Sequence, residues 1–285
     1  MTIMTQPSAN LGSERTGDRL SSPALWEKLN MTEVLYEPFS HAYWQDDFHF
    51  TPALTSATTA VNRYPYMSYI DTGNTIVMLA TEKMLGVLRL SADASDNDGP
   101  IITLPGDAGT QFVISDTAGD DMPMWYEHRF RKSSITNNQA AIFLGFVEEG
   151  RCIDDGLMAD NTGVPTSTID VLAFNTPHDT GTALDFVWHK ASQTRQELAD
   201  VDVLVADTWY KNGFHYDPSR DTAERIRVFV NNIPHTSFVT GTQIAAATFP
   251  DAEELTWAFG LKCGEATAVT ADIDWVRIAQ KIRAT

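Results

Sequence analysis

The chain has 285 residues, 43% of them hydrophobic, and a formal net charge of −18 at pH 7. This hydrophobic content is ordinary for a globular protein and excludes wholesale disorder. The excess of acidic residues disfavours binding to nucleic acids and to anionic membranes, because both carry the same sign of charge. The first residues lack the apolar segment of a secretory signal, and no apolar run is long enough to span a bilayer. We therefore expect a protein made and folded in a cytoplasm, with no nucleic-acid or membrane partner.

Residues 1–69 are predicted to form an N-terminal arm. The first 20 residues are polar and rich in turn formers, which predicts a flexible segment. Ser22 followed by Pro23 is a typical helix start, so one short helix of two to three turns is expected there. The aromatic side chains that follow are expected to dock on their own sandwich or on a neighbouring subunit. The candidate partner-binding residues of the arm are Trp26, Tyr36, Phe39, Tyr43 and Trp44.

From residue 70 onward, the dominant pattern has a period of two residues. Large apolar side chains alternate with other residues in the stretches 124–131, 184–189, 225–230 and 255–263. This alternation is typical of strands with one face on a core. Gly-, Pro- and Asp-rich turns separate further expected strands, near residues 76–80, 85–91, 101–104, 111–115, 140–148, 169–175, 208–216, 237–240 and 267–279. The pattern predicts an all-β antiparallel sandwich over residues 70–285, with one helical turn near residues 194–198.

In the last expected strand the apolar residues change face. Ile273 and Trp275 lie on one side of an extended chain, whereas Val276 and Ile278 lie on the other. Either a β-bulge re-aims the strand or both of its faces are covered at that end. A basic group closes the chain and is either a solvated cluster or a contact for an acidic neighbour; its members are Arg277, Lys281 and Arg283.

Several segments in chain order resemble the strands of concanavalin-A-like jelly-roll sandwiches, the fold of lectins, glucanases and laminin-G-like domains. The resemblance spans residues 70–280 and is carried by Met124–Phe130, Ile142–Val147, Asp207–Phe214, Arg227–Asn232 and Asp272–Arg277. Each segment is mainly a pattern of apolar residues and turns, and their order carries the likeness. The resemblance implies an antiparallel jelly-roll sandwich behind an extended arm with one short helix.

A narrower likeness lies in the stretch Leu88–Pro100, which reads LRLSADASDNDGP. It resembles sandwich proteins encoded among the head genes of tailed bacteriophages. This implies a non-enzymatic virion structural protein, made in the host cytoplasm, that decorates or cements the capsid exterior by binding the major capsid protein. By analogy such subunits act as closed homo-oligomers, and a trimer is expected.

Residues for catalysis are sparse. A glucanase of this fold would carry two carboxylates on one strand in a Glu-x-Asp-x-x-Glu spacing, about 5–5.5 Å apart in a retaining enzyme. The sequence has no such spacing, and its adjacent acid pairs, Glu148-Glu149 and Glu253-Glu254, would point to opposite faces of a strand. It also has no Gly-x-Ser-x-Gly elbow and no His-Glu-x-x-His motif. We therefore expect no enzymatic activity, with a divergent glycoside hydrolase as the less favoured alternative.

Calcium is the one metal for which the sequence offers candidate ligands, Asp93, Asp96 and Asp98, because calcium prefers clustered oxygen ligands. The EF-hand spacing fails, since Ala94 and Pro105 would occupy its first and last ligand positions. A second, weaker candidate is the group Asp116, Asp120 and Asp121. For both groups the alternative is turn formation by Asp and Asn. No other cofactor is expected.

Carbohydrate binding is the main alternative function. It requires exposed aromatic rings next to amide and carboxylate groups. The residues that could supply such a platform are Trp209, Tyr210, Asn212, His215 and Tyr216. The same side chains would equally suit the core of a sandwich.

Overall fold

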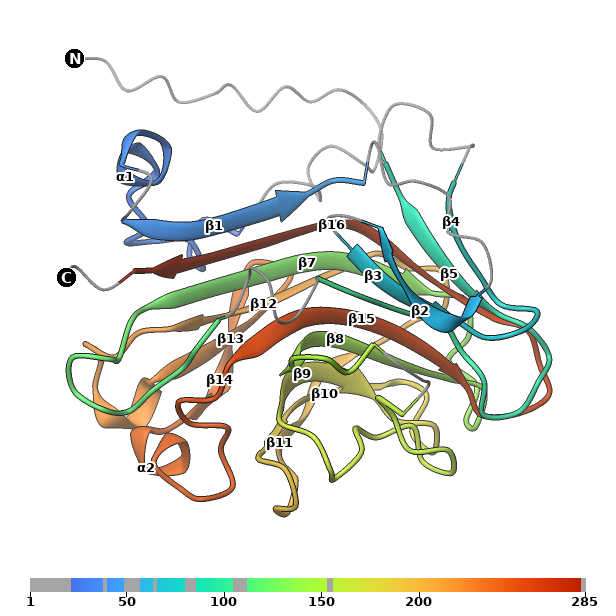
Figure 1. The fold of residues 1–285 in the computed structure, drawn as a ribbon. Coiled ribbons are helices and arrows are strands. Elements are labelled where there is room, and N and C mark those ends of the chain that lie inside the picture. The colour runs from blue at the N-terminus through green and yellow to red at the C-terminus, as the bar shows by residue number, and fades with distance from the viewer. Residues whose placement is uncertain are drawn as a thin grey trace.

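The computed structural model describes residues 22–37, 40–48, 57–63, 66–79, 86–104, 112–152 and 156–282, with the backbone alone for 57–63. Two antiparallel sheets lie face to face (Figure 1). The first sheet contains β1 (His41–Asp46), β4 (Thr75–Met78), β5 (Leu88–Ala92), β7 (Met124–Lys132), β12 (Tyr210–Tyr216), β13 (Ile226–Val230), β14 (Ile233–Val239) and β16 (Val269–Lys281). The second contains β2 (Ala57–Arg63), β3 (Tyr66–Ile70), β6 (Ile101–Thr103), β8 (Ala140–Glu148), β9 (Val171–Thr176), β10 (Ala183–His189), β11 (Gln196–Val203) and β15 (Leu255–Cys263).

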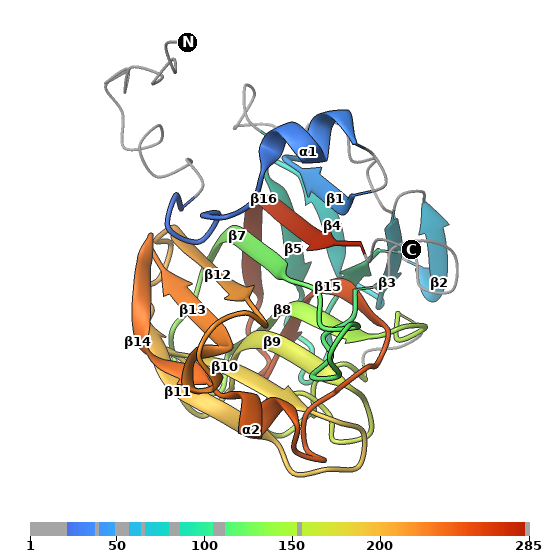
Figure 2. The same ribbon diagram turned by 90° about the vertical axis from the view of Figure 1, so that its left-hand side faces the viewer.

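The strand order of the first sheet is β14-β13-β12-β7-β16-β5-β4, with β1 paired to β16 beside this path, and that of the second is β11-β10-β9-β8-β15-β6-β3-β2. The helices that the structure describes are short: α1 (Met31–Tyr36), the 3-10 turn η2 (Thr222–Glu224) and α2 (Gly241–Ile244). Figure 2 shows α1 beside β1 at one end of the first sheet. None of these helices is long and apolar enough to cross a membrane. The predicted all-β antiparallel sandwich is confirmed.

The core between the sheets is rich in aromatic rings. Tyr126 of β7 lies 4.9 Å from Phe146 of β8 and 5.5 Å from Phe214 of β12, measured between ring centroids. The indole N–H of Trp257, on β15, donates to the Tyr126 hydroxyl at 3.2 Å. These contacts join strands of both sheets and satisfy polar atoms that would otherwise be buried without a partner.

A β-bulge explains the change of face in the last strand. The register between β7 and β16 shifts between Ile273 and Trp275, so that Asp274 is the extra residue. Ile273 therefore faces the core, whereas Trp275 faces outward, and Val276 and Ile278 face the core again. Trp275 is also buried, so the outer side of the strand is covered at this point as well.

The sandwich begins before the predicted boundary at residue 70. β1 pairs with β16 and β3 pairs with β6, so the segment assigned to an arm supplies strands to both sheets. In β1, Trp44 turns into the core and packs against Trp257 at a centroid distance of 5.4 Å, whereas Tyr43 turns outward. This is the period-two pattern of a strand, and the density of aromatic residues around it concealed the alternation.

The helix predicted from Ser22 is only one turn long. The N–H of Trp26 donates to the carbonyl of Ser22 at 3.2 Å, and the chain then leaves the helical path at Lys28, whose φ is 69°. The regular helix α1 starts later, with Asn30 as its N-cap. The physical reason is that Ser22 does not cap a helix, since its N–H and hydroxyl are used by side chains of the first sheet.

Two local predictions are wrong, and a third is right in kind but not in its bounds. Residues from Gln196 form β11, not a helical turn, because their backbone pairs with the neighbouring strand β10. The expected strand near 111–115 is reduced to a single bridge between Phe112 and Leu255. The strand expected near 237–240 starts earlier, at Ile233, and has a mixed pattern of exposure. For β11 and β14, pairing with a neighbouring strand outweighs the local sequence pattern.

His128 is an ionisable group inside this core. Its ring lies 5.1 to 5.4 Å from the rings of Tyr126, Phe130 and Phe174, and neither ring nitrogen has a hydrogen-bond partner. Burial lowers its pKa to about 3. Because an unfolded histidine has a pKa of about 6.5, the folded protein binds fewer protons than the unfolded chain between these two values. Stability is therefore lost as the pH falls through this window.

We expect His128→Phe to make the fold less sensitive to acid. The substitution keeps a ring of similar size among aromatic neighbours. It removes the histidine that must lose its proton when the chain folds in acid. Between pH 7 and pH 5, the free energy of unfolding should fall by about 2 kcal/mol less in the variant than in the wild type. Urea denaturation at the two pH values measures this. His235→Asn, on the edge strand β14, serves as the control and should leave the difference unchanged. An equal loss of stability in His128→Phe and wild type would show that His128 does not contribute to the acid response.

Candidate functional site: the outer face of the first sheet

A short N-terminal segment lies across the outer face of the first sheet, and we call residues 22–29 the docking segment. Its anchor is Glu127, which points outward from β7 and is completely buried under the segment. The backbone N–H of Ser22 donates to both carboxylate oxygens, at 3.0 and 3.2 Å, and the indole N–H of Trp26 donates to one of them at 2.6 Å. Burial raises the pKa of Glu127, and these hydrogen bonds oppose that shift.

An apolar contact seats the same segment. Leu25 is fully buried against Trp125, Phe229 and Ala279, which point outward from three different strands. Beneath it lies Gly213 of β12, where an added Cβ would come within 2.6 Å of the Leu25 side chain. The glycine therefore makes room for the leucine, and the alternation of β12 leaves a notch in the sheet at this position.

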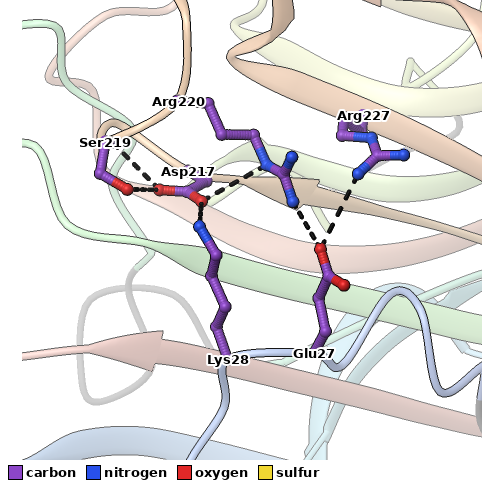
Figure 3. Close-up of polar contacts among 6 residues, drawn as sticks. All are labelled: Glu27, Lys28, Asp217, Ser219, Arg220 and Arg227. Carbon is purple, nitrogen blue, oxygen red and sulfur yellow. Dashed lines mark hydrogen bonds and ion pairs between the residues drawn. The ribbon is translucent and has the colours of Figure 1, made fainter.

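Ion pairs hold the far end of the docking segment to the turn after β12 (Figure 3). The ammonium of Lys28 lies 2.6 Å from the carboxylate of Asp217. Ser219 donates to the same carboxylate from its N–H at 3.0 Å and from its hydroxyl at 2.6 Å. Partial burial acts to raise the pKa of Asp217, but the hydrogen bonds from Lys28 and Ser219 outweigh it and lower this pKa to about 2.

Glu27 makes the second ion pair of this group. Its carboxylate lies 2.6 Å from the guanidinium of Arg220 and 3.8 Å from that of Arg227, as Figure 3 shows. Glu27 and Lys28 are both largely exposed, so these pairs add little to stability on their own, about 0–1 kcal/mol each. The strength of the docking comes from Glu127 and Leu25, and the ion pairs fix its direction.

An open pocket of about 370 Å³ lies between the docking segment and β1. The guanidinium of Arg277 lies at its edge, 4.8 Å above the ring of Trp275, and makes no ion pair with any other described residue. The pocket therefore combines apolar walls with one cation, and Arg277 also lines a smaller pocket that it shares with Asp46 and Asp47. Its lining residues are Trp26, Leu29, Met31, Tyr43, Gln45 and Arg277.

The residues predicted to bind a partner divide between this pocket and other places. Trp26 and Tyr43 both line the pocket. Tyr36 lies on α1 and is 79% exposed, whereas Trp44 is partly buried and packs against the core. Phe39 lies outside the described residues. Sequence alone does not tell which side of an edge strand faces the core, so it could not separate Trp44 from Tyr43.

A smaller polar groove of about 190 Å³ lies on the other side of the docking segment, on the same outer face. Trp209 forms its aromatic wall, and the guanidinium groups of Arg129 and Arg131 lie 4.4 and 4.6 Å from the centroid of its ring. Arg129 is also paired with the carboxylate of Asp274 at 2.7 Å. Lys211 completes the basic side of the groove. The sequence signal for this groove was that Arg129 and Arg131 alternate with the apolar core residues of β7, which places both arginines on the outer face.

The predicted carbohydrate platform is mostly buried. Tyr210, Asn212 and Tyr216 point from β12 into the sandwich, and His215 stacks on Trp125 at a centroid distance of 5.0 Å. Only Trp209 of this group is partly exposed. The alternation of β12 explains the outcome, because it sends every second side chain inward.

The outer face of the second sheet, which is its concave face in Figure 1, is covered by the connection between β8 and β9. Leu157 and Met158 of this connection belong to one apolar cluster with outward side chains of β6, β8, β9, β10 and β15. Lys262 donates to the Met158 carbonyl at 2.9 Å and pairs with Asp160 at 2.6 Å. Asn175, from β9, donates to the Gly163 carbonyl at 3.0 Å. The centre of this face is therefore sealed by the chain itself.

One open groove of about 460 Å³ remains beside this cover, along β10 and β11. It contains Asp185 and Glu197, which come from neighbouring strands. Burial raises the pKa of Asp185, whose carboxylate accepts the N–H of Asp200 at 2.9 Å. Glu197 is paired with Arg195 at 2.7 Å. Both carboxylates are thus engaged within the fold, and they do not share one strand as a glucanase pair would.

The calcium candidates do not gather into a site. No group of three or more His, Cys, Asp or Glu side chains suited to a metal occurs among the described residues. Asp93 instead accepts the N–H of Ser95 at 2.9 Å, and its own N–H donates to Asn74 at 2.9 Å. Asn97 has a φ of 68°, typical of a turn. Asp93, Asp96 and Asp98 therefore lie in a turn, which is the alternative that the sequence left open.

We expect Glu127→Ala to release the docking segment. The change removes the acceptor for Ser22 and Trp26, and hydrogen bonds to a charged group contribute about 1.5–3 kcal/mol each. Trypsin should then cleave after Lys28 roughly 10 to 100 times faster, because local opening limits cleavage of a docked segment. Mass spectrometry of the products measures the rate at this bond. The control is Glu33→Ala on α1, which should cleave at the wild-type rate. Unchanged cleavage in Glu127→Ala would contradict the anchoring role.

No protein-family model matches the sequence, and no curated protein is similar to it in a sequence comparison. Solved structures are similar in fold. A protein of unknown function from Shewanella oneidensis MR-1 matches with a TM-score of 0.52 and 18% identity, over 90% of this chain and 96% of that one. An endo-1,3-β-glucanase from Streptomyces sioyaensis matches with a TM-score of 0.52 and 14% identity, over 85% of this chain and 96% of that one. Peanut lectin matches with a TM-score of 0.50 and 12% identity, over 86% of this chain and 99% of that one. At these identities the similarity shows the fold alone: the chain is a concanavalin-A-like jelly-roll sandwich.

Proposed function

We propose that the protein is a non-enzymatic binding subunit that decorates or cements the outer surface of a tailed-bacteriophage capsid by holding the major capsid protein. The non-enzymatic part of the proposal rests on how the outer faces of the two sheets are covered. One is sealed at its centre by apolar residues of the β8–β9 connection, and the two carboxylates in its open groove, Asp185 and Glu197, are on different strands and engaged within the fold. The other carries the docked N-terminal segment. A polysaccharide chain needs an open cleft with a carboxylate pair to be cleaved.

The virion part of the proposal is supported by the likeness of the stretch Leu88–Pro100 to head-gene sandwich proteins. In the structure this stretch is β5 and the turn that follows it, and β5 lies in the first sheet between β16 and the edge strand β4. The net charge of −18 fits an exterior position better than one against packaged DNA. The exposed apolar side chains of α1 are also typical of a surface that meets another protein.

Purified virus particles provide the test. Mass spectrometry should find this chain in the particles at a fixed ratio to the major capsid protein. Treatment with protease should reach it before the packaged DNA is exposed, since it lies outside. Particles that lack the chain would overturn the proposal. A panel of polysaccharides serves as the companion assay, and turnover of any of them would overturn the non-enzymatic part.

Glycan binding is the second candidate, and the observation that favours it is the groove at Trp209. An aromatic ring beside guanidinium and amide groups is suited to a sugar face and its hydroxyls. If this candidate holds, the wild type binds on a glycan array and Trp209→Ala binds the same glycan at least tenfold more weakly. Tyr36→Ala, on the exposed helix α1, is the control and should bind as the wild type does. An array without signal would exclude this candidate.

A further inference from the structure

The outer face of the first sheet is basic in a strongly acidic protein. The register of the strands places seven basic and three acidic side chains on this face. The basic ones are Arg89, Arg129, Arg131, Lys211, Arg227, Arg277 and Lys281, and the acidic ones are Glu127, Asp272 and Asp274. Positive charge is therefore concentrated where the rest of the surface is negative.

The three carboxylates of this face are already engaged. Asp272 lies between two guanidinium groups, with Arg89 at 2.6 Å and Arg131 at 2.8 Å. Asp274 is paired with Arg129 at 2.7 Å. Glu127 is enclosed by the docking segment. Arg227 lies 3.8 Å from Glu27 of the docking segment, so Arg277 and Lys281 are cations of this face that make no ion pair with another described residue.

Arg277 places a positive charge beside an apolar pocket. The side chains of Trp26, Leu29 and Met31 form the apolar wall, and Arg277 lies at the opening beside Tyr43. A pocket of about 370 Å³ is in the size range that holds one large side chain or a small ligand. On the adjoining helix α1, Leu35 and Tyr36 are 68% and 79% exposed. Apolar and cationic surface therefore form one continuous area.

We propose that this basic face is the surface that holds the partner, and that the partner presents an acidic peptide segment with a large apolar side chain beside a carboxylate. The apolar side chain enters the pocket of Trp26 and Leu29, and the carboxylate pairs with Arg277. Further acidic residues of the same segment are attracted at longer range by the positive charge of the face. This inference rests on the proposed function and adds the chemistry of the contact.

Two other polyanions fit the face less well. The net charge of −18 repels nucleic acid at long range. An acidic polysaccharide would pair with the guanidinium groups but has no side chain that fills an apolar pocket lined by Leu29 and Met31. A peptide supplies both groups at short spacing, and a local segment with few charges is repelled less than a long polyanion.

The experiment titrates the full chain with three synthetic peptides that share phenylalanine and leucine at fixed positions. The first has aspartate and glutamate between them, the second asparagine and glutamine, and the third lysine. Indole N–H resonances of Trp26 and Trp209 report binding by NMR and are assigned with tryptophan-to-phenylalanine variants. The acidic peptide should shift the Trp26 resonance and bind at least tenfold more tightly than the other two. Its affinity should fall as salt is raised from 50 to 300 mM, because exposed charge pairs are screened.

Arg277→Gln should weaken the acidic peptide about fivefold to tenfold and bring its affinity close to that of the amide peptide. Arg277→Lys keeps the charge and should restore the preference. Arg195→Gln, which removes a charge beside the second sheet, is the matched control and should change nothing. Thermal melting of each variant confirms that it folds.

Equal affinity for acidic and amide peptides, or equal weakening by Arg195→Gln, would overturn the proposal. Polygalacturonate that binds with the same dependence on Arg277 would overturn the assignment to a peptide.

The outcomes also separate this inference from the proposed function. If the chain is present in particles and Arg277→Gln is incorporated at full ratio, the capsid role stands and this surface is not the contact. If particles lack the chain but the peptide preference holds, the surface is assigned correctly and the capsid role is wrong.

Discussion

The buried carboxylate of Glu127 fixes how the N-terminal part of the chain meets the sandwich. A carboxylate taken out of water without partners costs several kcal/mol, so a segment that covers Glu127 must bring donors to the right place. The N–H of Ser22 and the indole of Trp26 do this from positions four residues apart, on one turn. Any shifted docking would leave the charge buried and unpaired. The interaction therefore selects one position of the segment more strongly than it stabilises the fold.

The pocket next to the segment depends on that position. Trp26 is both a donor to Glu127 and a wall of the pocket, whereas Tyr43 and Arg277 come from β1 and β16. The pocket thus exists only when the docking segment is in place. A partner that fills it would in turn hold the segment down, because binding to the docked form adds its own free energy to the docking equilibrium. Attachment and ordering of the N-terminal segment are linked in this way.

The sandwich itself could be predicted from the sequence because its central strands have one buried side. In β7, Tyr126 and Phe130 alternate with Glu127 and Arg129, and this pattern alone identifies the strand and the face of each residue. The same alternation predicted the bulge near Asp274 as one of two explanations. These elements are fixed by local burial, which a single sequence displays.

The edges and the site could not be predicted in the same way. β1 and β11 are strands because a neighbouring strand offers hydrogen bonds, and that neighbour is distant in sequence. The role of Glu127 depends on Ser22, 105 residues earlier, and no local pattern marks the pair. Gly213 has no sequence signature either, although its missing side chain admits Leu25. What was missed therefore consists of contacts between distant segments.

The two outer faces are closed by different physical means, and the two covers differ in how firmly they are held. Leu157 and Met158 seal the second sheet with apolar contacts and with hydrogen bonds from the buried Lys262, and opening this cover would expose both. The docking segment on the first sheet is held by fewer apolar groups, and its ion pair between Lys28 and Asp217 is half exposed to water. Such pairs weaken as salt rises and are easily exchanged. On the first sheet, the proposed partner would therefore meet a cover that is only weakly held and would stabilise it by filling the pocket beside it.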